Sequence, residues 1–579
     1  MEIIRGSARK PISTDRLVEI FEEKFADLEG VLYVGYPVLS SSDESVSIDA
    51  LLISRNHGVV AINLIEGKDA NGYGELQDDI ASLLDAKFMQ HKVLRKGRTL
   101  LAVPATLTYA PLLEPDEDED SHRLVNDTDI VNAINSIEWT HTQLYESVLS
   151  VIQSISTIRR NRRRRTNVRT DSHGAALQAL EDSIANLDAR QSKAVIETVE
   201  GVQRIRGLAG SGKTIVLALK AAYLHSQNPD WKIAVTFNTR SLKEQFLRLI
   251  ETFVVEQTGE QPNENIKVIN AWGAPGGASR TGMYYQFCVQ NGATYYDFQQ
   301  AKNKFGYEKA FAGATSTAMS EVKAIAPIYD AILIDEAQDF DPSFLQLCYH
   351  SLTTEKRLVY AYDELQSLTD ASLPGPEEIF GVDAQGKPLV TFDGSVPSQD
   401  IILDKCYRNS RPVLASAHAL GFGIYRDPDQ KLGTGLTQMF DRAQLWTDVG
   451  YEVLDGQLED DHRVRLGRTK LASPQFLESP GEVDGLIVFG HFKNANEQAQ
   501  WIADQIIKNL KMDELRAEDI IVINPDPVST ARQVGPIRKI LFDKGIPSHL
   551  AGVDTSGDVF FKPDEGSIAF TGIFRAKGN

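Results

Sequence analysis

Cysteine is scarce in this sequence: only three occur among 579 residues, at positions 288, 348 and 406. Their wide spacing excludes a disulfide framework and a cysteine metal site, and it favours a reducing cytoplasm. Long apolar runs are also missing. Stretches such as DAILID are far shorter than a membrane span, and the start MEIIRGSARK lacks the apolar core of a signal peptide. We therefore expect a soluble, cytoplasmic protein.

Positive charge is in deficit as well. The chain has 60 Lys and Arg against 80 Asp and Glu, a net charge of −20. The sum alone argues against a sequence-independent nucleic-acid binder, which is usually basic. The charge is uneven, however, with an acidic segment EPDEDED at 114–120 and an arginine run RRNRRRR at 159–165. Solvated surface is the simplest interpretation of both, and phosphate or protein contact is the alternative for the arginines.

The length predicts two to four domains, and no short repeat is visible. Changes of pattern divide the chain into four regions. We expect an N-terminal domain at 1–115, an acidic, helical and basic connector at 116–175, and two further domains at 176–394 and 395–579.

The N-terminal region alternates helical and extended patterns. DRLVEIFEEKF has helical spacing, whereas VLYVGYPVL, SIDALLIS and GVVAINLI are typical of strands, the last two joined by a turn at 56–58. The stretch DIVNAINSIEWTHTQLYESVLSVIQSIS then repeats apolar residues at helical spacing. It predicts a helical connector that runs into the arginines.

The remaining regions repeat a strand, loop and helix order. GVQRIRGLAGSGKTIVLALKAAYLH, KIAVTFNTRSLKEQFLRLI and YDAILIDEAQDF each end an apolar strand at polar residues. GLIVFGHFKNANEQAQWIADQIIKNL and EDIIVINPD continue the theme beyond residue 395. The fold class predicted by this order is α/β, with parallel sheets flanked by helices.

One loop has the composition of a phosphate site. GLAGSGKT, at 207–214, matches G-x-x-x-x-G-K-[ST] between a strand and a helix. Its glycines allow backbone N–H groups to surround phosphates, the lysine reaches the outer phosphates, and the hydroxyl can ligate Mg²⁺. The predicted nucleotide-binding residues of this loop are Gly207, Gly210, Ser211, Gly212, Lys213 and Thr214.

A second motif supplies carboxylates to the same chemistry. AILIDEAQD, at 331–339, is an apolar strand that delivers Asp335 to its carboxyl end, where a carboxylate can hold the metal with Thr214. Glu336 follows, in position to polarise an attacking water. The two motifs together predict an ATP- and Mg²⁺-dependent hydrolase, with Glu336 and Lys213 as catalytic residues.

Taken with further motifs, residues 185–579 resemble a superfamily 1 helicase of the UvrD/Rep type. LDARQSKAV resembles the glutamine motif, YDELQSL the coupling motif and CYRNSRPV the motif with a base-stacking tyrosine. The resemblance implies two RecA-like lobes. It also implies nucleotide contacts for Gln191, Gln366, Tyr407 and Arg408, with Gln366 as γ-phosphate sensor and Arg408 reaching that phosphate from the second lobe. Asp363 is the aspartate of the coupling motif.

The same resemblance implies a path for single-stranded nucleic acid. TFNTRSL and VINAWG resemble the family's strand-contacting motifs. Core packing is the alternative for the aromatic residues Phe237, Trp272 and Tyr407. The implied nucleic-acid residues are Phe237, Asn238, Thr239, Asn270 and Trp272.

The N-terminal segment SIDALLISRNHGVVAINLIEGK resembles a nuclease-related domain of the PD-(D/E)xK type. Asp49 fits the metal-binding aspartate, but Asn63 and Ile65 occupy the positions of the glutamate and lysine. Glu66 and Lys68 repeat the spacing three residues later, and an odd shift would turn the apolar face outward. We therefore expect a degenerate nuclease fold that serves docking or nucleic-acid contact.

The final stretch SIAFTGIFRAKGN resembles a coupling motif of the second lobe that ends in lysine and glycine, which implies a nucleic-acid contact for Lys577. The chain stops inside this motif, so we expect a fragment or a subunit completed by another chain, with impaired activity.

The leading expectation is an ATP- and Mg²⁺-dependent translocase or helicase that moves 3′ to 5′ on single-stranded DNA. The resemblance implies a role in DNA repair or anti-phage defence. The choice between DNA and RNA, and between unwinding and translocation, stays open. Two rivals are a regulatory NTPase switch that controls a protein partner and an ATP-powered nuclease that uses Asp49.

Overall fold

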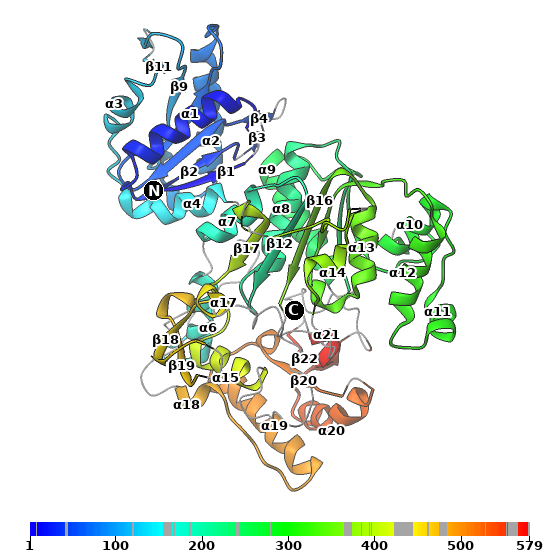
Figure 1. The fold of residues 1–579 in the computed structure, drawn as a ribbon. Helices are drawn as coiled ribbons and strands as arrows, with labels where there is room; N and C mark the ends of the chain where they lie inside the picture. The colour runs from blue at the N-terminus through cyan, green and yellow to red at the C-terminus, as the bar shows by residue number, and fades with distance from the viewer. Residues whose placement is uncertain are drawn as a thin grey trace.

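The computed structural model describes the chain except for residues 7, 37, 41–44, 119–120, 154–164, 166–167, 184–186, 239–241, 278–279, 364–372, 384, 393, 395, 422–443, 460–461, 474–482, 527, 552, 554–565 and 577–579. Three main sheets organise the described residues (Figure 1): an N-terminal sheet of seven strands, a central sheet of six and a C-terminal sheet of three. Helices flank all three, as the predicted α/β class requires. Within the described ranges, no helix is long and apolar enough to cross a lipid bilayer.

The N-terminal sheet has the strand order β1-β2-β5-β6-β9-β11-β10. The predicted turn is present, because β5 and β6 form an antiparallel hairpin in which Ser54 pairs with Gly58. The sheet also extends past the boundary expected at residue 115, through β10 and β11. Its strands are β1 (Glu2–Arg5), β2 (Gly30–Val34), β5 (Ala50–Ser54), β6 (Gly58–Leu64), β9 (Ala105–Tyr109), β10 (Asp116–Glu117) and β11 (Arg123–Val125). Two short ribbons stand beside it, β3 (Val38–Ser40) with β4 (Ser45–Ser47), and β7 (Arg95–Lys96) with β8 (Thr99–Leu100).

Helices cover both faces of the N-terminal sheet, which is why every residue of its central strands β5 and β6 is buried and nearly all of them are apolar. Ala50 and Leu52 point to the face that holds α1 (Pro11–Lys24) and α3 (Ile130–Asn135). Leu51 and Ile53 point to the face that holds α2 (Tyr73–Met89) and α4 (Tyr145–Ile152). Successive side chains of a strand point to opposite faces of the sheet, so β5 contributes to a hydrophobic core on each face.

The connector predicted as one continuous helical stretch is interrupted. Helices α3 and α4 are separated by residues 136–144, which include only a short 3₁₀ turn at Thr142–Leu144. In this gap the Trp139 N–H donates to the Asn56 carbonyl at 3.1 Å. A Cβ on Gly58 would lie 2.8 Å from the Trp139 ring. The indole therefore packs over the β5–β6 turn, and this tertiary contact overrides the local helical pattern.

The central sheet is wholly parallel, with the order β14-β13-β15-β16-β12-β17. Its strands are β12 (Val202–Gly207), β13 (Ile233–Phe237), β14 (Ile266–Asn270), β15 (Tyr329–Ile334), β16 (Leu352–Tyr362) and β17 (Asp400–Leu403). One face packs against α7 (Ala189–Ile196), α8 (Lys213–Gln227) and α9 (Leu242–Thr258). The other packs against α10 (Met283–Asn291), α12 (Ala310–Glu321), α13 (Pro342–His350) and α14 (Pro376–Phe380), and α11 (Phe298–Phe305) packs on α12.

The N-terminal sheet and the central sheet share one apolar core. Side chains of α2 and β5 belong to the same buried cluster as those of α8 and α9. At the junction the rings of Tyr36 and Tyr223 lie 5.8 Å apart, and the Tyr223 hydroxyl donates to the Gly35 carbonyl at 3.3 Å. Lys87 and Glu256 add a mostly covered ion pair at 3.7 Å. The two units are therefore docked through a hydrophobic interface.

Strand β17 belongs to the central sheet, although it lies beyond the boundary expected at residue 394. It pairs in parallel with β12, and Asp400 at its start bonds two arginines of that strand. Its carboxylate accepts from Arg204 at 2.7 Å and from Arg206 at 2.6 Å. This charge pairing helps to hold the strand on the central sheet.

The C-terminal sheet has three parallel strands in the order β20-β22-β21. They are β20 (Ile521–Asn524), β21 (Ser548–Leu550) and β22 (Ile568–Gly572), packed with α19 (Ala495–Lys511) and α20 (Thr530–Asp543) and followed by α21 (Ile573–Ala576). The strand predicted from GLIVFGHF is wrong: the segment holds part of α18 (Val483–Leu486), then residues without strand pairing in which Val488 and Phe489 are exposed. A separate module contains α15 (Arg411–Gly421), α17 (Gln444–Asp448) and the hairpin of β18 (Tyr451–Gly456) with β19 (Val464–Arg468).

The segment that precedes the central sheet contacts Glu514 and Asp519, which lie just before the first strand of the C-terminal sheet. It contains α6 (His173–Ser183). Arg165, from the arginine run, forms a 2.6 Å ion pair with Asp519, and both side chains are almost fully buried. The Arg169 N–H also donates to Glu514 at 2.7 Å. Arg165 is thus a structural residue rather than an exposed phosphate contact, and residues 159–164 lie outside the described residues.

Candidate functional site

The phosphate loop lies at the carboxyl end of β12 and leads into α8, as its motif predicts. Gly212 precedes the helix with φ +87°, and Gly210 has φ +83°. A Cβ on Gly212 would lie 2.8 Å from the side-chain nitrogen of Gln191. Both glycines therefore adopt a left-handed backbone, and Gly212 also permits the close approach of the Gln191 side chain.

The loop lysine is folded back over the loop. Lys213 Nζ donates to the carbonyls of Gly207 at 2.8 Å and Leu208 at 3.2 Å, and it lies 3.8 Å from the Asp363 carboxylate at the end of β16. Ser211 Oγ is buried, with no hydrogen-bond partner among the described residues. A phosphate oxygen would satisfy such groups, so the loop fits a phosphate-bearing nucleotide.

Two oxygen ligands for a metal lie side by side. Thr214 Oγ1 donates to Asp335 Oδ2 at 2.8 Å, which brings the start of α8 to the end of β15. Asp335 is fully buried, and its burial together with the nearby Glu336 carboxylate raises its pKa. A hydroxyl and a carboxylate suit Mg²⁺, whose charge would favour the ionised form of that carboxyl group.

Glu336 has an unusual backbone. Its φ of 52° and ψ of 48° are left-handed, a conformation that costs a non-glycine residue energy. Its N–H donates to Asp335 Oδ1 at 3.0 Å, and its carboxylate accepts from the side chain of Gln338. Gln338 in turn accepts from the Asp363 N–H at 3.1 Å. Gln338, which carries no sequence signal of its own, thus links the ends of β15 and β16.

The glutamine motif is anchored by a capping box. Asp188 caps α7 by accepting from the Gln191 N–H at 2.8 Å, while Gln191 donates from its side chain to the Ser211 carbonyl at 2.8 Å. Asp188 Oδ2 also accepts from the Tyr407 hydroxyl at 2.6 Å. Burial, and then the Asp188 charge, raises the pKa of Tyr407. The D-x-x-Q spacing in LDARQ is the signal that would have found Asp188.

A further positioning residue is Lys220 on α8, which is fully buried. Its ammonium donates to the Ala194 carbonyl at 3.0 Å and the Glu197 carbonyl at 2.7 Å, at the end of α7. Burial lowers the pKa of Lys220 to about 7. The lysine holds the glutamine-motif helix against the phosphate-loop helix.

Residues 406–409 pack directly on the phosphate loop. Cys406 Sγ donates to the Ala209 carbonyl at 3.0 Å, and the Tyr407 N–H donates to the Gly210 carbonyl at 3.0 Å. A Cβ on Gly210 would lie 3.0 Å from the Cβ of Arg408. The expectation that Arg408 comes from the second lobe is therefore corrected: it follows β17 of the same sheet, because Asp400 fixes that strand on β12. Gln366 lies outside the described residues.

The residues expected from TFNTRSL and VINAWG to contact nucleic acid differ in their exposure to solvent. Phe237 is fully buried and stacks on Phe246 at 5.6 Å, so its predicted role as a strand contact is wrong. Asn238 is exposed at the end of β13, whereas Thr239 and Lys577 fall outside the described residues. Asn270 Oδ1 is buried, and no described group bonds it.

Trp272 is engaged in an aromatic cluster with α10 to α12. Its ring stacks on Phe311 at 4.9 Å and meets the edge of Phe298 at 5.8 Å. Its indole N–H donates to the Tyr296 carbonyl at 3.0 Å. The core alternative describes this ring better than a free stacking surface.

In the N-terminal domain the carboxylates of Asp49 and Glu66 both accept hydrogen bonds from groups of the protein itself. Asp49 accepts from Lys10 Nζ at 2.8 Å, and Glu66 accepts from the Ile12 N–H at 2.6 Å. Both partners lie at the start of α1. Asn63, in β6, is buried. Lys10 and the amino end of α1 thus neutralise carboxylate charges that could otherwise bind a metal ion. The described residues contain no cluster of three or more His, Cys, Asp or Glu arranged to hold a metal.

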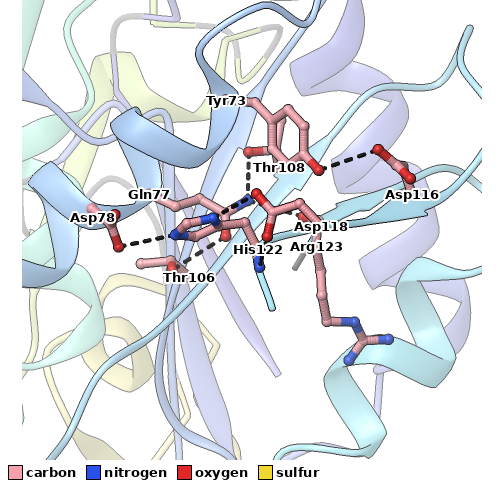
Figure 2. A network of polar contacts seen from close by, with 9 residues as sticks. All are labelled: Tyr73, Gln77, Asp78, Thr106, Thr108, Asp116, Asp118, His122 and Arg123. Atoms are coloured by element: carbon pink, nitrogen blue, oxygen red, sulfur yellow. Dashed lines mark hydrogen bonds and ion pairs between the residues drawn. The ribbon is translucent and has the colours of Figure 1, made fainter. Parts of the chain in front are cut away.

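The described residues 114–118 of the acidic segment are exposed, as expected, and part of the segment belongs to the hairpin of β10 and β11 (Figure 2). His122 bridges two carboxylates, with Nδ1 2.7 Å from Asp118 and Nε2 3.0 Å from Asp78 on α2. A Cβ on Gly74 would lie 2.8 Å from His122 Nδ1, so glycine permits the contact. Glu119 and Asp120 lie outside the described residues. His122 therefore helps to hold the hairpin on α2, together with the bonds that the side chains of Tyr73 and Gln77 on α2 donate to Asp116 and to the Arg123 carbonyl.

This bridge predicts a pH dependence. Hydrogen bonds to Asp78 and Asp118 raise the pKa of His122 above 6.5. A raised folded-state pKa means that the bridge stabilises the fold fully below pH 6.5, and that this contribution is lost as pH rises through the raised value. We expect NMR titration of labelled histidine, assigned with His122→Gln, to give a pKa above 6.5. Titration at or below 6.5 would contradict the bridge.

Comparison with known proteins adds little. No family model matches the chain, and no curated protein matches it. Among solved structures, the chain is similar to one described as ATP-dependent Type ISP restriction-modification enzyme LlaBIII bound to DNA, at 10% sequence identity and a TM-score of 0.22. The similarity covers 96% of this chain but only 33% of that chain. At this TM-score it carries no argument about fold or function.

Proposed function

We propose that this chain is an ATP- and Mg²⁺-dependent motor of the superfamily 1, UvrD/Rep-like type that moves along single-stranded nucleic acid. One observation carries the proposal: segments far apart in sequence converge at the carboxyl edge of the central sheet. Thr214 bonds Asp335 at 2.8 Å, and Lys213 faces Asp363 at 3.8 Å. Gln191 bonds the loop at Ser211. Parallel α/β sheets bind ligands at this edge.

The roles of the protein groups follow from their positions. The loop N–H groups and Lys213 would bind the phosphates of ATP, and Tyr407, held by Asp188, would border the base. Mg²⁺ held by Thr214 and Asp335 would neutralise charge on the transferred phosphoryl group. Glu336 would orient the attacking water and take up its proton. Arg408 would contact the phosphates from its position beside Gly210.

Movement requires that hydrolysis change the relation of two lobes. We assign the RecA-like lobes to the central and C-terminal sheets, with Asp363 and Gln366 as the coupling residues. Asp363 is suited to this role because it contacts both Lys213 and, through its N–H, Gln338. Loss of the γ-phosphate would alter Lys213 and Glu336 together; Lys213 faces Asp363 directly, and Glu336 is linked to it through Gln338. These contacts would carry a local change at the phosphate into a lobe movement.

For the N-terminal domain we propose a degenerate nuclease fold that docks rather than cleaves. This proposal is supported by the internal use of Asp49 and Glu66 at the start of α1. The ATP-powered nuclease is the weaker alternative, because asparagine and isoleucine stand at its metal and lysine positions.

The ATPase rate with and without nucleic acid tests the proposed motor. With Mg²⁺, we expect single-stranded DNA to raise the rate on the order of tenfold, a coupling of about 1.4 kcal/mol. Single-stranded RNA of equal length and duplex DNA are the matched controls, and the larger response identifies the substrate. Cleavage of either strand in Mg²⁺ or Mn²⁺, lost in Asp49→Ala, would contradict the degenerate assignment.

One observation favours a second candidate, a regulatory NTPase switch. The N-terminal sheet shares its core with α8, the helix that begins at Lys213, so nucleotide binding could be transmitted to a protein partner. An ATPase rate indifferent to DNA and RNA would support the switch and reject the motor.

A further inference from the structure

We propose that Phe298 and Tyr307 form a stacking platform for the bases of single-stranded nucleic acid. Phe298 is the first residue of α11, and Tyr307 follows the end of this helix. This inference rests on the proposed function and assigns that function a contact site. The site replaces Trp272, whose ring the sequence pattern had put forward and the structure places within an aromatic cluster.

The two rings are the exposed members of that cluster. Phe298 is 48% exposed and Tyr307 is 70% exposed, and their ring centroids lie 6.0 Å apart in an edge arrangement. Most large aromatic side chains avoid such exposure, because their burial contributes strongly to folding. Exposed rings placed together therefore indicate a surface with a partner.

The platform has a rigid base. Phe298 rests its edge on Trp272 at 5.8 Å, and Trp272 is in turn stacked on Phe311 of α12. A capping box of Asp297 and Gln300 fixes the start of α11. A Cβ on Gly313 would lie 2.3 Å from the Phe305 ring, so α11 and α12 pack at close range. Rings held in this way lose little conformational freedom when a base stacks on them.

The chemistry around the rings favours nucleic acid over an apolar protein partner. Residues 298–307, FQQAKNKFGY, contain two lysines and three side-chain amides, with Asp297 before them and Glu308 and Lys309 after them, in a chain with a net charge of −20. Lys302 Nζ lies 5.7 Å from the Tyr307 ring, and Lys304 Nζ lies 4.5 Å from the Tyr296 ring. Aromatic faces interleaved with cations match strands whose bases stack and whose phosphates are negative.

The location agrees with this use. The loop that contains Trp272 follows β14, whose carboxyl end lies at the same edge of the central sheet as the phosphate loop. Figure 1 shows α10, α11 and α12 grouped on the flank of the central sheet away from the N-terminal sheet. A strand on the platform would therefore reach the nucleotide edge without crossing the N-terminal domain.

Strand binding by the full chain tests the platform. The probe is fluorescein-labelled oligo(dT), with oligo(rU) of equal length, measured by anisotropy at one fixed salt concentration with Mg²⁺. We expect Phe298→Ala and Tyr307→Ala each to weaken binding about 5- to 150-fold, the range for loss of one stacked base. Val289→Ala, which shortens an exposed apolar side chain of α10, is the control and should bind as the wild type does.

Conservative and charge variants separate stacking from folding. Phe298→Trp and Tyr307→Phe should keep the affinity of the wild type, and the strand-free ATPase rate of every variant should stay unchanged. Affinity falls as salt rises, and Lys302→Gln should make the slope of log affinity against log salt less steep by about 0.7, the value for one lost phosphate contact on a single strand.

The outcomes distinguish this inference from the proposed function. If the wild type binds the strand and the double variant Phe298→Ala/Tyr307→Ala binds it equally well, the platform is rejected and the motor stands. If the wild type binds neither oligo(dT) nor oligo(rU), both are rejected. Loss of self-association in the double variant with intact strand binding would assign the patch to a second copy and overturn the inference.

Discussion

Replacement of Glu336 by glutamine is expected to lower ATP turnover by about 10²- to 10⁴-fold, the usual contribution of a positioned general base. Glutamine keeps the length of the side chain and can still bond Gln338, and it is no more strained than glutamate in the left-handed conformation. The amide, however, cannot take up a proton from water. Phosphate release under saturating ATP measures the effect, and binding of a fluorescent ATP analogue should be unchanged.

The matched control for Glu336→Gln is Glu355→Gln. Glu355 is 41% exposed on β16 and lies 3.7 Å from Arg357, so its replacement removes the same charge from the same sheet away from the site. Turnover within tenfold of the wild type in Glu336→Gln would reject the assigned role. Loss of nucleotide binding in that variant would instead show that Glu336 shapes the phosphate site.

Replacement of Asp400 by alanine is expected to destabilise the central sheet by about 3 kcal/mol or more, because it leaves two guanidinium groups of β12 without their carboxylate. The side chains of Arg204 and Arg206 are only 9% and 11% exposed. Hydrogen exchange of the β12 amides measures the loss. Because β17 carries Tyr407 and Arg408 on its continuation, nucleotide affinity should fall as well.

The effect of Asp400→Ala should depend on pH in a defined direction. Burial acts to raise the pKa of Asp400, but the hydrogen bond from Arg204 and the charges of both arginines outweigh it and lower the pKa below 3.8. The carboxylate therefore contributes its full stabilisation above pH 3.8, and this contribution is lost as pH falls through the lowered value.

The difference between the wild type and Asp400→Ala should accordingly be constant near neutral pH and shrink in acid. Glu200→Ala, at an exposed carboxylate just before β12, is the control and should change stability by less than about 0.5 kcal/mol. A loss of stability in Asp400→Ala no larger than in this control would show that β17 is held by its backbone pairing alone.

The local geometry of the candidate nucleotide site could be predicted from sequence because it depends on short stretches of the chain. GLAGSGKT begins at the last residue of β12 and runs into α8, and AILIDEAQD contains the end of β15 and the turn after it, so each motif holds its reactive side chains within ten residues. Strand, glycine turn and helix depend on short-range backbone preferences, so the motif brings its structure with it. The same holds for the β5–β6 hairpin, whose turn at 55–57 joins two apolar strands.

The nucleic-acid candidates could not be sorted in this way, because the exposure of an aromatic side chain is not a local property. Phe237 and Trp272 are aromatic residues at the ends of apolar stretches, whereas Phe298 lies in the polar stretch DFQQAKNK. Packing against Phe246 buries the first, packing against Phe311 engages the second, and the third is left exposed. The interrupted connector and the missing strand at 485–492 have the same origin, because tertiary contacts decide between local patterns of similar energy.

The sequence by itself therefore determined the α/β class, the phosphate loop and the pair Asp335 and Glu336, because short-range geometry suffices for each. Only the tertiary structure decided which lobe carries Arg408, since the ion pair of Asp400 joins residues about two hundred positions apart. It also decided that Asp49 faces Lys10 and that Asp188 bonds Tyr407. Such contacts depend on where the whole chain folds back on itself, and no short stretch of sequence encodes that.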